Sequence, residues 1–227
     1  MQRIQFITFD AAGTLIAPNP TVGEIYAETL RDRGMICEAA PIEKKFRESF
    51  GQALAESPEA MLQPRVFWKN IVQESISGYC PDDQMEVVFE ILWNRFGEGR
   101  AWRLMEGTKD TLTHLRSSGI RLGVLSNNDS RLHGVLEDLG ILPFFEQVFV
   151  SAEIGYSKPD PQIFKEVETA LKLPASALLH VGDDPVLDEE AARKAGWRSI
   201  LVGEENDPGW RVNDLGEIPD LLAEVTA

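Results

Sequence analysis

Cysteine and histidine are scarce in this sequence, which has two cysteines and three histidines among its 227 residues. Cys37 and Cys80 are far apart and lack the close spacing of a zinc site. We therefore expect two free thiols in a reducing compartment, in preference to a disulfide. No apolar run approaches the roughly 18 residues of a membrane span, and no signal-peptide layout precedes the first strand pattern. These absences predict a cytoplasmic protein without membrane contact.

Positive charge is also scarce, with 22 Lys and Arg against 37 Asp and Glu and a formal net charge of −15. Such a surface repels nucleic acid and anionic membranes, and no segment forms a basic stripe. An anionic substrate would be repelled at long range as well, so a site for one requires local cations or a metal ion. Nothing in the sequence indicates an oligomeric state.

The apolar pattern changes twice along the chain. It predicts a buried strand over residues 3–9 and then four amphipathic helices, over 21–33, 41–56, 64–77 and 82–96. From residue 107 strands alternate with helices, which is typical of a parallel sheet with right-handed crossovers. The helices expected there span 108–118, 130–139, 161–172, 186–195 and 217–225, and the strands span 121–125, 148–150, 177–181 and 199–202.

These patterns predict an α/β protein with a doubly wound parallel sheet. Its core domain is expected from residues 1–17 and 104–227, with an inserted helical bundle over residues 18–103. Residues 204–211 are expected to form an irregular loop. Four aromatic side chains of the insertion are expected in its core or at its contact with the sheet domain, with stacking on a substrate as the less favoured alternative, namely Trp68, Trp93, Phe96 and Trp102.

The stretch after the first strand is the first candidate site. The apolar run from Ile4 to Phe9 ends in Asp10-Ala11-Ala12-Gly13-Thr14. The carboxyl end of a buried strand is where an open α/β sheet builds its site. The glycine permits a tight turn or a close ligand, and the threonine hydroxyl can fix the turn. Alone, this stretch is as typical of an Asp-stabilised turn as of a catalytic carboxylate.

Three later segments favour the catalytic interpretation. They are Ser126-Asn127, Ser157-Lys158-Pro159-Asp160-Pro161, and Gly182-Asp183-Asp184 with Asp188. Because most of these segments follow apolar strands, we expect them to meet at one edge of the sheet. A carboxylate, a hydroxyl, a lysine and a second acidic cluster form a set suited to phosphoryl transfer. Carboxylates from two strand ends suit Mg²⁺, which together with the lysine would offset the charge of a phosphate.

In this order and spacing the segments resemble the haloacid dehalogenase superfamily of hydrolases. The resemblance covers nearly the whole chain and is tightest from Leu125 to Gly196. Within the superfamily the chain is most similar to subfamily I, which has a type-one helical cap, and to the branch named for haloacid dehalogenase-like hydrolase domain-containing protein three. This resemblance implies a Rossmann-like core with a helical cap. It also implies a magnesium-dependent phosphohydrolase that acts on a small phosphorylated metabolite through an aspartyl-phosphate intermediate.

The resemblance assigns the metal site. Asp10 would be both the nucleophile and a Mg²⁺ ligand, and the backbone carbonyl of Ala12 would be a second ligand. Asp183 would bind the metal directly. Asp188, and Asp184 with it, would support the site from close by.

The resemblance also assigns the phosphate site. Ser126 and the backbone amide of Asn127 would hold the phosphoryl oxygens. Lys158 would bridge the nucleophile and the phosphate. Thr14 would brace the loop that carries the nucleophile.

One position departs from the phosphatase pattern. Family phosphatases carry a second aspartate two residues after the nucleophile, which protonates the leaving oxygen and then activates water. Here that residue is Ala12. General acid–base catalysis contributes roughly 10²–10⁴ in rate. We therefore expect a slow enzyme, or one that takes good leaving groups such as acyl phosphates, or one that borrows a base from the cap or the substrate.

Three alternatives remain at this stage. A phosphonatase-like carbon–phosphorus hydrolase shares the Asp-x-Ala-Gly-Thr motif but requires a cap lysine, for which Lys44, Lys45 and Lys69 are candidates. A binding protein on the same fold would need no acid or base at position 12. A dehalogenase fits less well, because that branch has an aromatic residue at position 12 and lacks the Gly-Asp metal motif.

Two further residues have plain structural interpretations. His180 precedes the metal motif on a predicted strand, and alternation directs it away from the side of Asp183. We expect it to be a core histidine bonded to the backbone. Arg131 is expected to lie at the surface or to face the cap.

Overall fold

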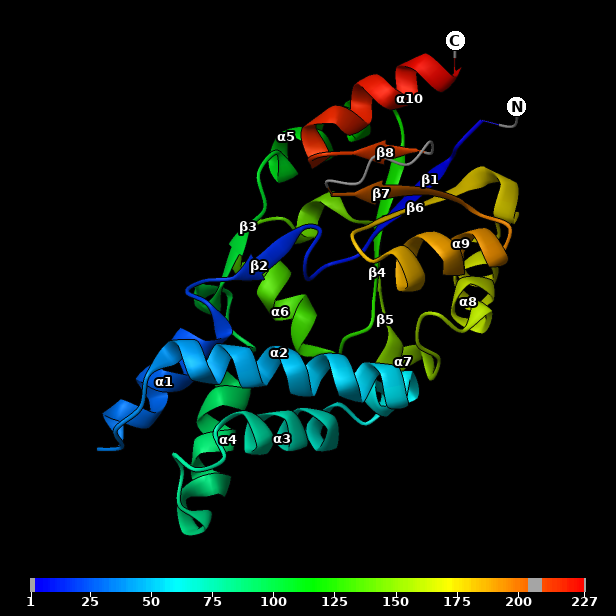
Figure 1. The fold of residues 1–227 in the computed structure, drawn as a ribbon. Helices are drawn as coiled ribbons and strands as arrows, with labels where there is room; N and C mark the ends of the chain where they lie inside the picture. Colours follow the sequence, from blue (N-terminus) through cyan, green and yellow to red (C-terminus); the bar gives the residue numbers. More distant parts are fainter. Residues whose placement is uncertain (1–2, 204–209, 227) are drawn as a thin grey trace.

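The computed structural model describes residues 3–203 and 210–226, and its centre is a six-stranded parallel sheet (Figure 1). The strand order is β5-β4-β1-β6-β7-β8, and every neighbouring pair runs parallel. The strands are β1 (Phe6–Phe9), β4 (Arg121–Ser126), β5 (Gln147–Val150), β6 (Leu178–Gly182), β7 (Arg198–Val202) and β8 (Arg211–Val212). The predicted doubly wound α/β architecture is therefore confirmed.

Strand alternation divides the core between the two faces of the sheet. Ile7 and Phe9 of β1 pack on one face, and Phe6 packs on the other. The first face is covered by α5 (Thr108–Ser117), α6 (Arg131–Asp138) and α10 (Ile218–Thr226). The second face is covered by α8 (Pro161–Leu171) and α9 (Ala191–Lys194). Burial on both faces explains why the strand sequences are almost continuously apolar.

The inserted helices form a second hydrophobic cluster, built around residues such as Tyr26 and Phe89. The helices are α1 (Val22–Asp32), α2 (Ala39–Glu56), α3 (Pro64–Ser75) and α4 (Met85–Arg95). Figure 1 shows them gathered at one end of the molecule, with α10 at the other. A capping box between Thr21 and Glu24 begins α1.

The chain enters and leaves this helical region through a two-stranded antiparallel ribbon. The ribbon pairs β2 (Ile16–Pro18) with β3 (Trp102–Leu104). The domain boundaries that the sequence predicts, at 17/18 and 103/104, fall within these two strands. The ribbon therefore holds both connections between the helical region and the sheet side by side.

Several short elements were not predicted. They include β2, β3, β8 and α7 (Ser151–Ile154), and the expected helix 186–195 divides into a π-helical turn, η6 (Pro185–Glu190), followed by α9. The expected loop 204–211 falls mostly outside the described residues, and its last residue, Arg211, belongs to β8. The remaining short helical turns are η1 (Pro58–Leu62), η2 (Asp82–Gln84), η3 (Gly99–Ala101), η4 (Leu142–Phe144), η5 (Ala175–Ala177) and η7 (Leu215–Glu217).

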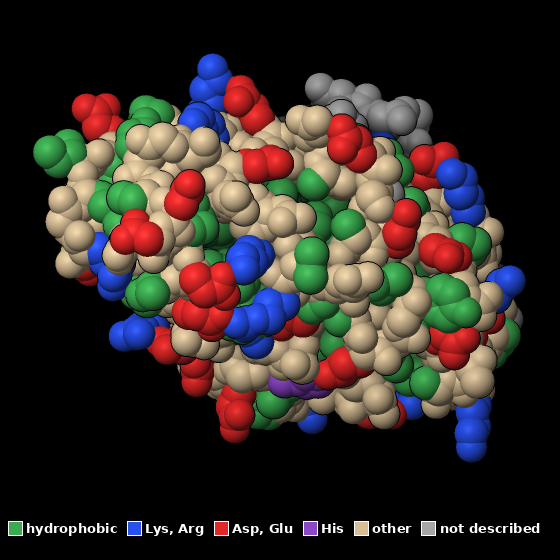
Figure 2. Space-filling view, turned by 90° about the horizontal axis from the view of Figure 1, so that it is seen from below, with side chains coloured by type: hydrophobic (Ala, Val, Ile, Leu, Met, Phe, Trp, Pro, Cys, Tyr) green, Lys and Arg blue, Asp and Glu red, His purple; other side chains and the backbone are tan. Residues whose placement is uncertain are grey.

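The surface mixes charges of both signs. Figure 2 shows acidic, basic and hydrophobic side chains interspersed over the face seen from below. Within residues 3–203 and 210–226, no helix is long and apolar enough to cross a membrane. Cys37 and Cys80 are free thiols, as expected.

We expect a side chain at Gly123 in β4 to destabilise the sheet. An added Cβ would lie 2.7 Å from Cε1 of the buried Phe6 ring and 3.0 Å from the Gln147 carbonyl oxygen. Overpacking of this kind costs about 1–3 kcal/mol, so Gly123→Ala should lower the free energy of unfolding by that amount in urea denaturation. The matched control is Gly51→Ala on the exposed side of α2, where a Cβ meets no atom within 4 Å. That control should stabilise the protein by up to about 1 kcal/mol, and equal effects of the two changes would contradict the packing described.

Candidate active site

Three predicted motifs lie at the same edge of the sheet because their strands are neighbours. β1 lies between β4 and β6, and all three run parallel. Asp10 follows β1, Ser126 ends β4, and Gly182-Asp183 lies at the end of β6. Their carboxyl ends therefore meet at one edge, as the sequence predicts. Ser126 is buried there, beside Asn127.

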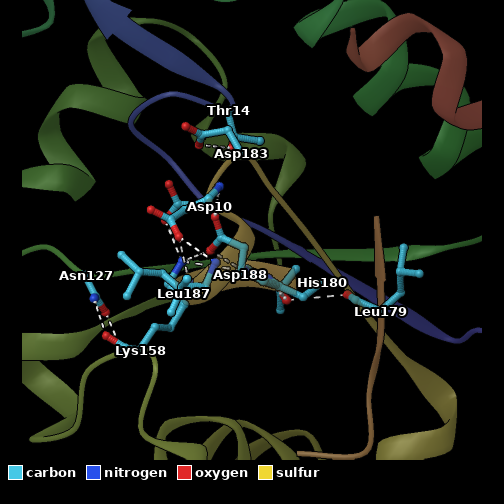
Figure 3. Close-up of polar contacts among 12 residues, drawn as sticks. Asp10, Thr14, Asn127, Lys158, Leu179, His180, Asp183, Leu187 and Asp188 are labelled. Carbon is cyan, nitrogen blue, oxygen red and sulfur yellow. Dashed lines mark hydrogen bonds and ion pairs between the residues drawn. The ribbon is translucent and has the colours of Figure 1, made fainter. Parts of the chain in front are cut away.

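Lys158 connects two of the carboxylates (Figure 3). Its Nζ donates to Asp10 Oδ1 at 2.8 Å and to Asp188 Oδ1 at 2.5 Å, and its side chain is only 2% exposed. The Asn127 side chain holds the backbone of Lys158 with two 2.8 Å hydrogen bonds, one donated and one accepted. The asparagine amide thus fixes the loop that carries the lysine.

Two motif glycines let carboxylates approach the backbone. Gly13 has a φ of 100°, and an added Cβ would lie 2.3 Å from Asp183 Oδ2. At Gly182 a Cβ would lie 2.1 Å from Asp188 Cγ. Thr14 Oγ1 donates to Asp183 Oδ1 at 2.8 Å, which fixes the turn as predicted from its hydroxyl. Each glycine is therefore required by a carboxylate packed directly against it.

Asp10, Asp183 and Asp188 form an acidic cluster that can hold a cation. Each offers one carboxylate oxygen, and these oxygens all lie within 4.8 Å of one another. Three carboxylates against the one ammonium of Lys158 leave a net charge of −2 when all are ionised. Hard oxygen ligands and an unbalanced charge of two suit Mg²⁺, so the residues fit the metal that the family resemblance implies.

The three carboxylates differ in how many of their oxygens already have partners within the protein. Asp188 Oδ1 accepts from Lys158 and lies 3.0 Å from His180 Nε2, and its Oδ2 accepts from the backbone N–H of Asp184 at 3.0 Å. Asp10 and Asp183 are therefore better placed than Asp188 to donate an oxygen to a metal. Asp184 Oδ1 instead accepts from the backbone N–H groups of Val186 and Leu187, which caps η6.

The pKa shifts reflect this uneven compensation. Burial raises the pKa of Asp10 to about 6, and the nearby charges of Asp188 and Asp183 add to the rise that Lys158 opposes. Desolvation at the rim of the site also raises the pKa of Asp183, against its hydrogen bond from Thr14. Burial would raise the pKa of Asp188 as well, but Lys158 and His180 outweigh it and lower that pKa. The negative charge that is least fully compensated thus lies on Asp10 and Asp183.

His180 belongs to this site, contrary to its expected bonding to the backbone. The fully buried ring lies 2.9 Å (Nδ1) from Thr8 Oγ1, 3.0 Å (Nε2) from Asp188 Oδ1 and 3.5 Å (Nε2) from Lys158 Nζ. Burial and the Lys158 charge lower its pKa, which favours the neutral form of the ring. The expected core position is right, but alternation places the ring on the face of α8 and α9, beside the segments that carry Lys158 and Asp188. The signal that could have indicated this contact is a polar residue inside each of two apolar strands, Thr8 in β1 and His180 in β6, which pair with each other.

Ala12 brings no acid or base to the site. It is exposed and lines a cavity of about 220 Å³ between the sheet domain and the helical region. The described residues that line this cavity include no carboxylate, histidine or lysine. The four aromatic residues expected in the insertion's core or at its contact with the sheet domain all line it, namely Trp68, Trp93, Phe96 and Trp102.

The three cap lysines lie elsewhere. Lys44 pairs with Glu48 at 3.8 Å, and Lys69 forms an ion pair with Glu86. Lys45 donates to the Ser77 carbonyl oxygen at 2.9 Å. None of the three is among the residues that line the cavity.

Comparison with known proteins places this chain in a family. A model of haloacid dehalogenase-like hydrolases matches residues 4–196. The chain therefore belongs to this family of hydrolases.

Particular relatives agree with this assignment. The human "Haloacid dehalogenase-like hydrolase domain-containing protein 3" is 31% identical over 206 residues, which cover 88% of this chain and 82% of that protein. A 2-haloacid dehalogenase from Pseudomonas syringae pv. Tomato DC3000 has a similar structure, with a TM-score of 0.67 at 26% identity over 98% of this chain and 99% of that chain. The putative HAD-hydrolase YfnB from Bacillus subtilis, bound to magnesium, shares the fold with a TM-score of 0.77 at 20% identity over 98% and 100%.

We expect Asp10 to make the stability of the metal-free protein depend on pH. Its pKa is about 6 in the folded state against an ordinary 3.8, so the folded state holds the proton more tightly. Its contribution is fully present below about pH 4 and is lost as pH rises through about 6. The loss should amount to about 2–3 kcal/mol.

Urea denaturation of wild type and Asp10→Asn in chelator, at several values between pH 4 and 7, measures this contribution. The free energy of unfolding of the wild type should fall relative to the variant as pH rises. Asp110→Asn, the same change at an exposed site of α5, should retain the wild-type pH dependence. A constant difference between wild type and Asp10→Asn would show that Asp10 titrates normally.

Proposed function

We propose that the protein is a magnesium-dependent phosphohydrolase that uses Asp10 as its nucleophile. The observation that carries this proposal is the position of Asp10, held by Lys158 at 2.8 Å and next to Asp183 in a cluster of net charge −2. Such a cluster is stable when a cation balances it, and the cation and Lys158 can then receive a phosphate dianion.

The chain's own residues divide the work between nucleophile and phosphate binding. Lys158 holds the Asp10 carboxylate toward the incoming phosphorus and offsets its charge. Ser126 Oγ and the Asn127 backbone N–H, at the end of β4, would hold the phosphoryl oxygens. Mg²⁺ would be held by Asp10, Asp183 and the Ala12 carbonyl, with Asp188 in support, and would supply positive charge against the phosphoryl oxygens.

The reaction takes two steps. An Asp10 carboxylate oxygen forms a bond to phosphorus, and the bond from phosphorus to the leaving oxygen breaks with its electron pair on that oxygen. Water then attacks the phosphorus of the aspartyl phosphate, which releases inorganic phosphate and restores Asp10. Neither step has an acid or base at Ala12, so the enzyme is slow or confined to leaving groups that depart without a proton.

The alternatives find less support. A phosphonatase needs a cap lysine above the nucleophile, and Lys44, Lys45 and Lys69 lie outside the cavity. A dehalogenase, the activity for which the 26% identical Pseudomonas syringae protein is named, does not account for Asp183 beside Asp10. A binding protein would not account for a buried lysine held between two carboxylates.

We expect Asp10→Asn to abolish magnesium-dependent hydrolysis of p-nitrophenyl phosphate, an activated phosphate ester. The amide cannot attack phosphorus, and it leaves the fold intact because Lys158 retains its partner Asp188. Release of p-nitrophenolate, followed by absorbance, measures turnover. Asp110→Asn should keep wild-type turnover. Hydrolysis by Asp10→Asn at the wild-type rate would reject Asp10 as the nucleophile.

We expect Ala12→Asp to raise turnover of ordinary alkyl phosphates by about 10-fold or more, since it restores an acid and base within the range of such catalysis. Phosphate release from an alkyl phosphate by both proteins measures the effect. Ala12→Asn, which has the same shape without a titrating proton, should give no gain. Equal rates for Ala12→Asp and wild type would mean that another group already serves as the acid and base.

A further inference from the structure

The cavity beside Ala12 has an unusual lining for a site that receives a phosphate. It extends from Ala12 and Asn127, next to the nucleophile and the phosphate-binding segment, into the helical region. Of the described residues that line it, Arg131 alone is charged. Eight lining side chains are aromatic, namely Tyr26, Phe46, Phe50, Trp68, Phe89, Trp93, Phe96 and Trp102.

Several of the rings that line the cavity are partly exposed. Phe50 stacks on Trp68, with ring centres 5.6 Å apart and planes 9° apart, and Phe46 stacks on Phe50 at 5.7 Å and 17°. All three are only half-buried. Half-buried aromatic rings that line a concave surface form a ready contact for a flat apolar ligand.

The one cation of the lining is already engaged. Arg131 forms a bidentate pair with Asp129, at 2.8 and 2.7 Å, and donates to the Trp93 carbonyl oxygen at 2.7 Å. Its guanidinium carbon lies 3.3 Å from the centre of the Trp93 ring. The arginine thus joins the sheet domain to α4, and its charge is balanced by Asp129. A second anionic group on the substrate would meet no uncommitted cation among these lining residues.

We propose that the substrates are phosphate esters of phenols, whose apolar ring occupies this cavity. The proposal rests on the phosphohydrolase function proposed above and names its substrate class. The cavity, about 220 Å³, exceeds the roughly 150 Å³ apolar cavity that accepts benzene. It therefore has room for one ring or two fused rings.

The chemistry of the leaving group agrees with the lining. When an Asp10 oxygen bonds to phosphorus, the bond from phosphorus to the phenolic oxygen breaks and phenolate leaves with the electron pair. Phenolate then takes its proton from water. A phenol has a pKa of about 10. Alkyl alcohols have much higher pKa values, close to the value of about 15.7 for water. The aryl leaving group therefore needs no acid at position 12, and Ala12 adds to the apolar wall instead.

The test compares two activated substrates, 2-naphthyl phosphate and acetyl phosphate, in the presence of Mg²⁺. The leaving groups of both substrates depart without an acid, but only 2-naphthyl phosphate has rings that can fill the cavity. Trp68→Ala should lower kcat/KM for 2-naphthyl phosphate by about 10-fold or more. It should leave kcat/KM for acetyl phosphate within about 2-fold of the wild-type value. Trp68→Phe should recover most of the loss. Tyr79→Ala, a half-buried cap aromatic that is not among the lining residues, should change neither value.

Acetyl phosphate also reports whether Trp68→Ala is folded. If a Trp68→Ala variant with the circular dichroism spectrum of the folded wild type lowers kcat/KM for both substrates equally, or for neither, the aryl assignment is overturned while the phosphohydrolase function stands. If the wild type hydrolyses neither substrate, the proposed function and the aryl assignment both fail.

Discussion

The structure depends on one buried ammonium group. Lys158 lies between Asp10 and Asp188, and its charge is the only one within the described cluster that opposes three carboxylates. Burial of such a group is costly unless it is paired and hydrogen-bonded. The pairing fixes the direction of Asp10, and Asn127 and His180 hold the lysine and its second partner in place. The remaining negative charge at Asp10 and Asp183 is what a divalent cation would balance.

The sheet makes this pairing possible because it joins distant parts of the chain. Asp10 and Lys158 are 148 residues apart, and they meet because β1 is central and α8 crosses the face next to it. Gly13 and Gly182 remove the side chains that would block Asp183 and Asp188. The β2–β3 ribbon then carries the helical region over the same edge, which places an apolar cavity beside an acidic site. Charge chemistry and substrate contact are thus supplied by different parts of the chain.

The sequence predicted what depends on local pattern. The long helices and buried strands follow from apolar periodicity, and the meeting of Asp10, Ser126 and Asp183 follows from parallel strands that share an edge. The two- and three-residue strands β2, β3 and β8 were missed because they are too short to show a period. The contact of His180 with Asp188 was missed because it depends on which helix covers which face. The aromatic cavity was missed for a similar reason, since periodicity cannot distinguish a ring that fills a core from one that lines a hollow.

Magnesium binding tests the central claim most directly. Calorimetric titration of Mg²⁺ into folded, chelator-treated protein at pH 7 should detect one site in the wild type. Asp183→Asn should lose it, whereas Asp184→Asn, which alters a neighbouring carboxylate that caps η6, should retain it with at most a small loss. Absence of magnesium binding by the wild type, or equal binding by Asp183→Asn, would contradict the account.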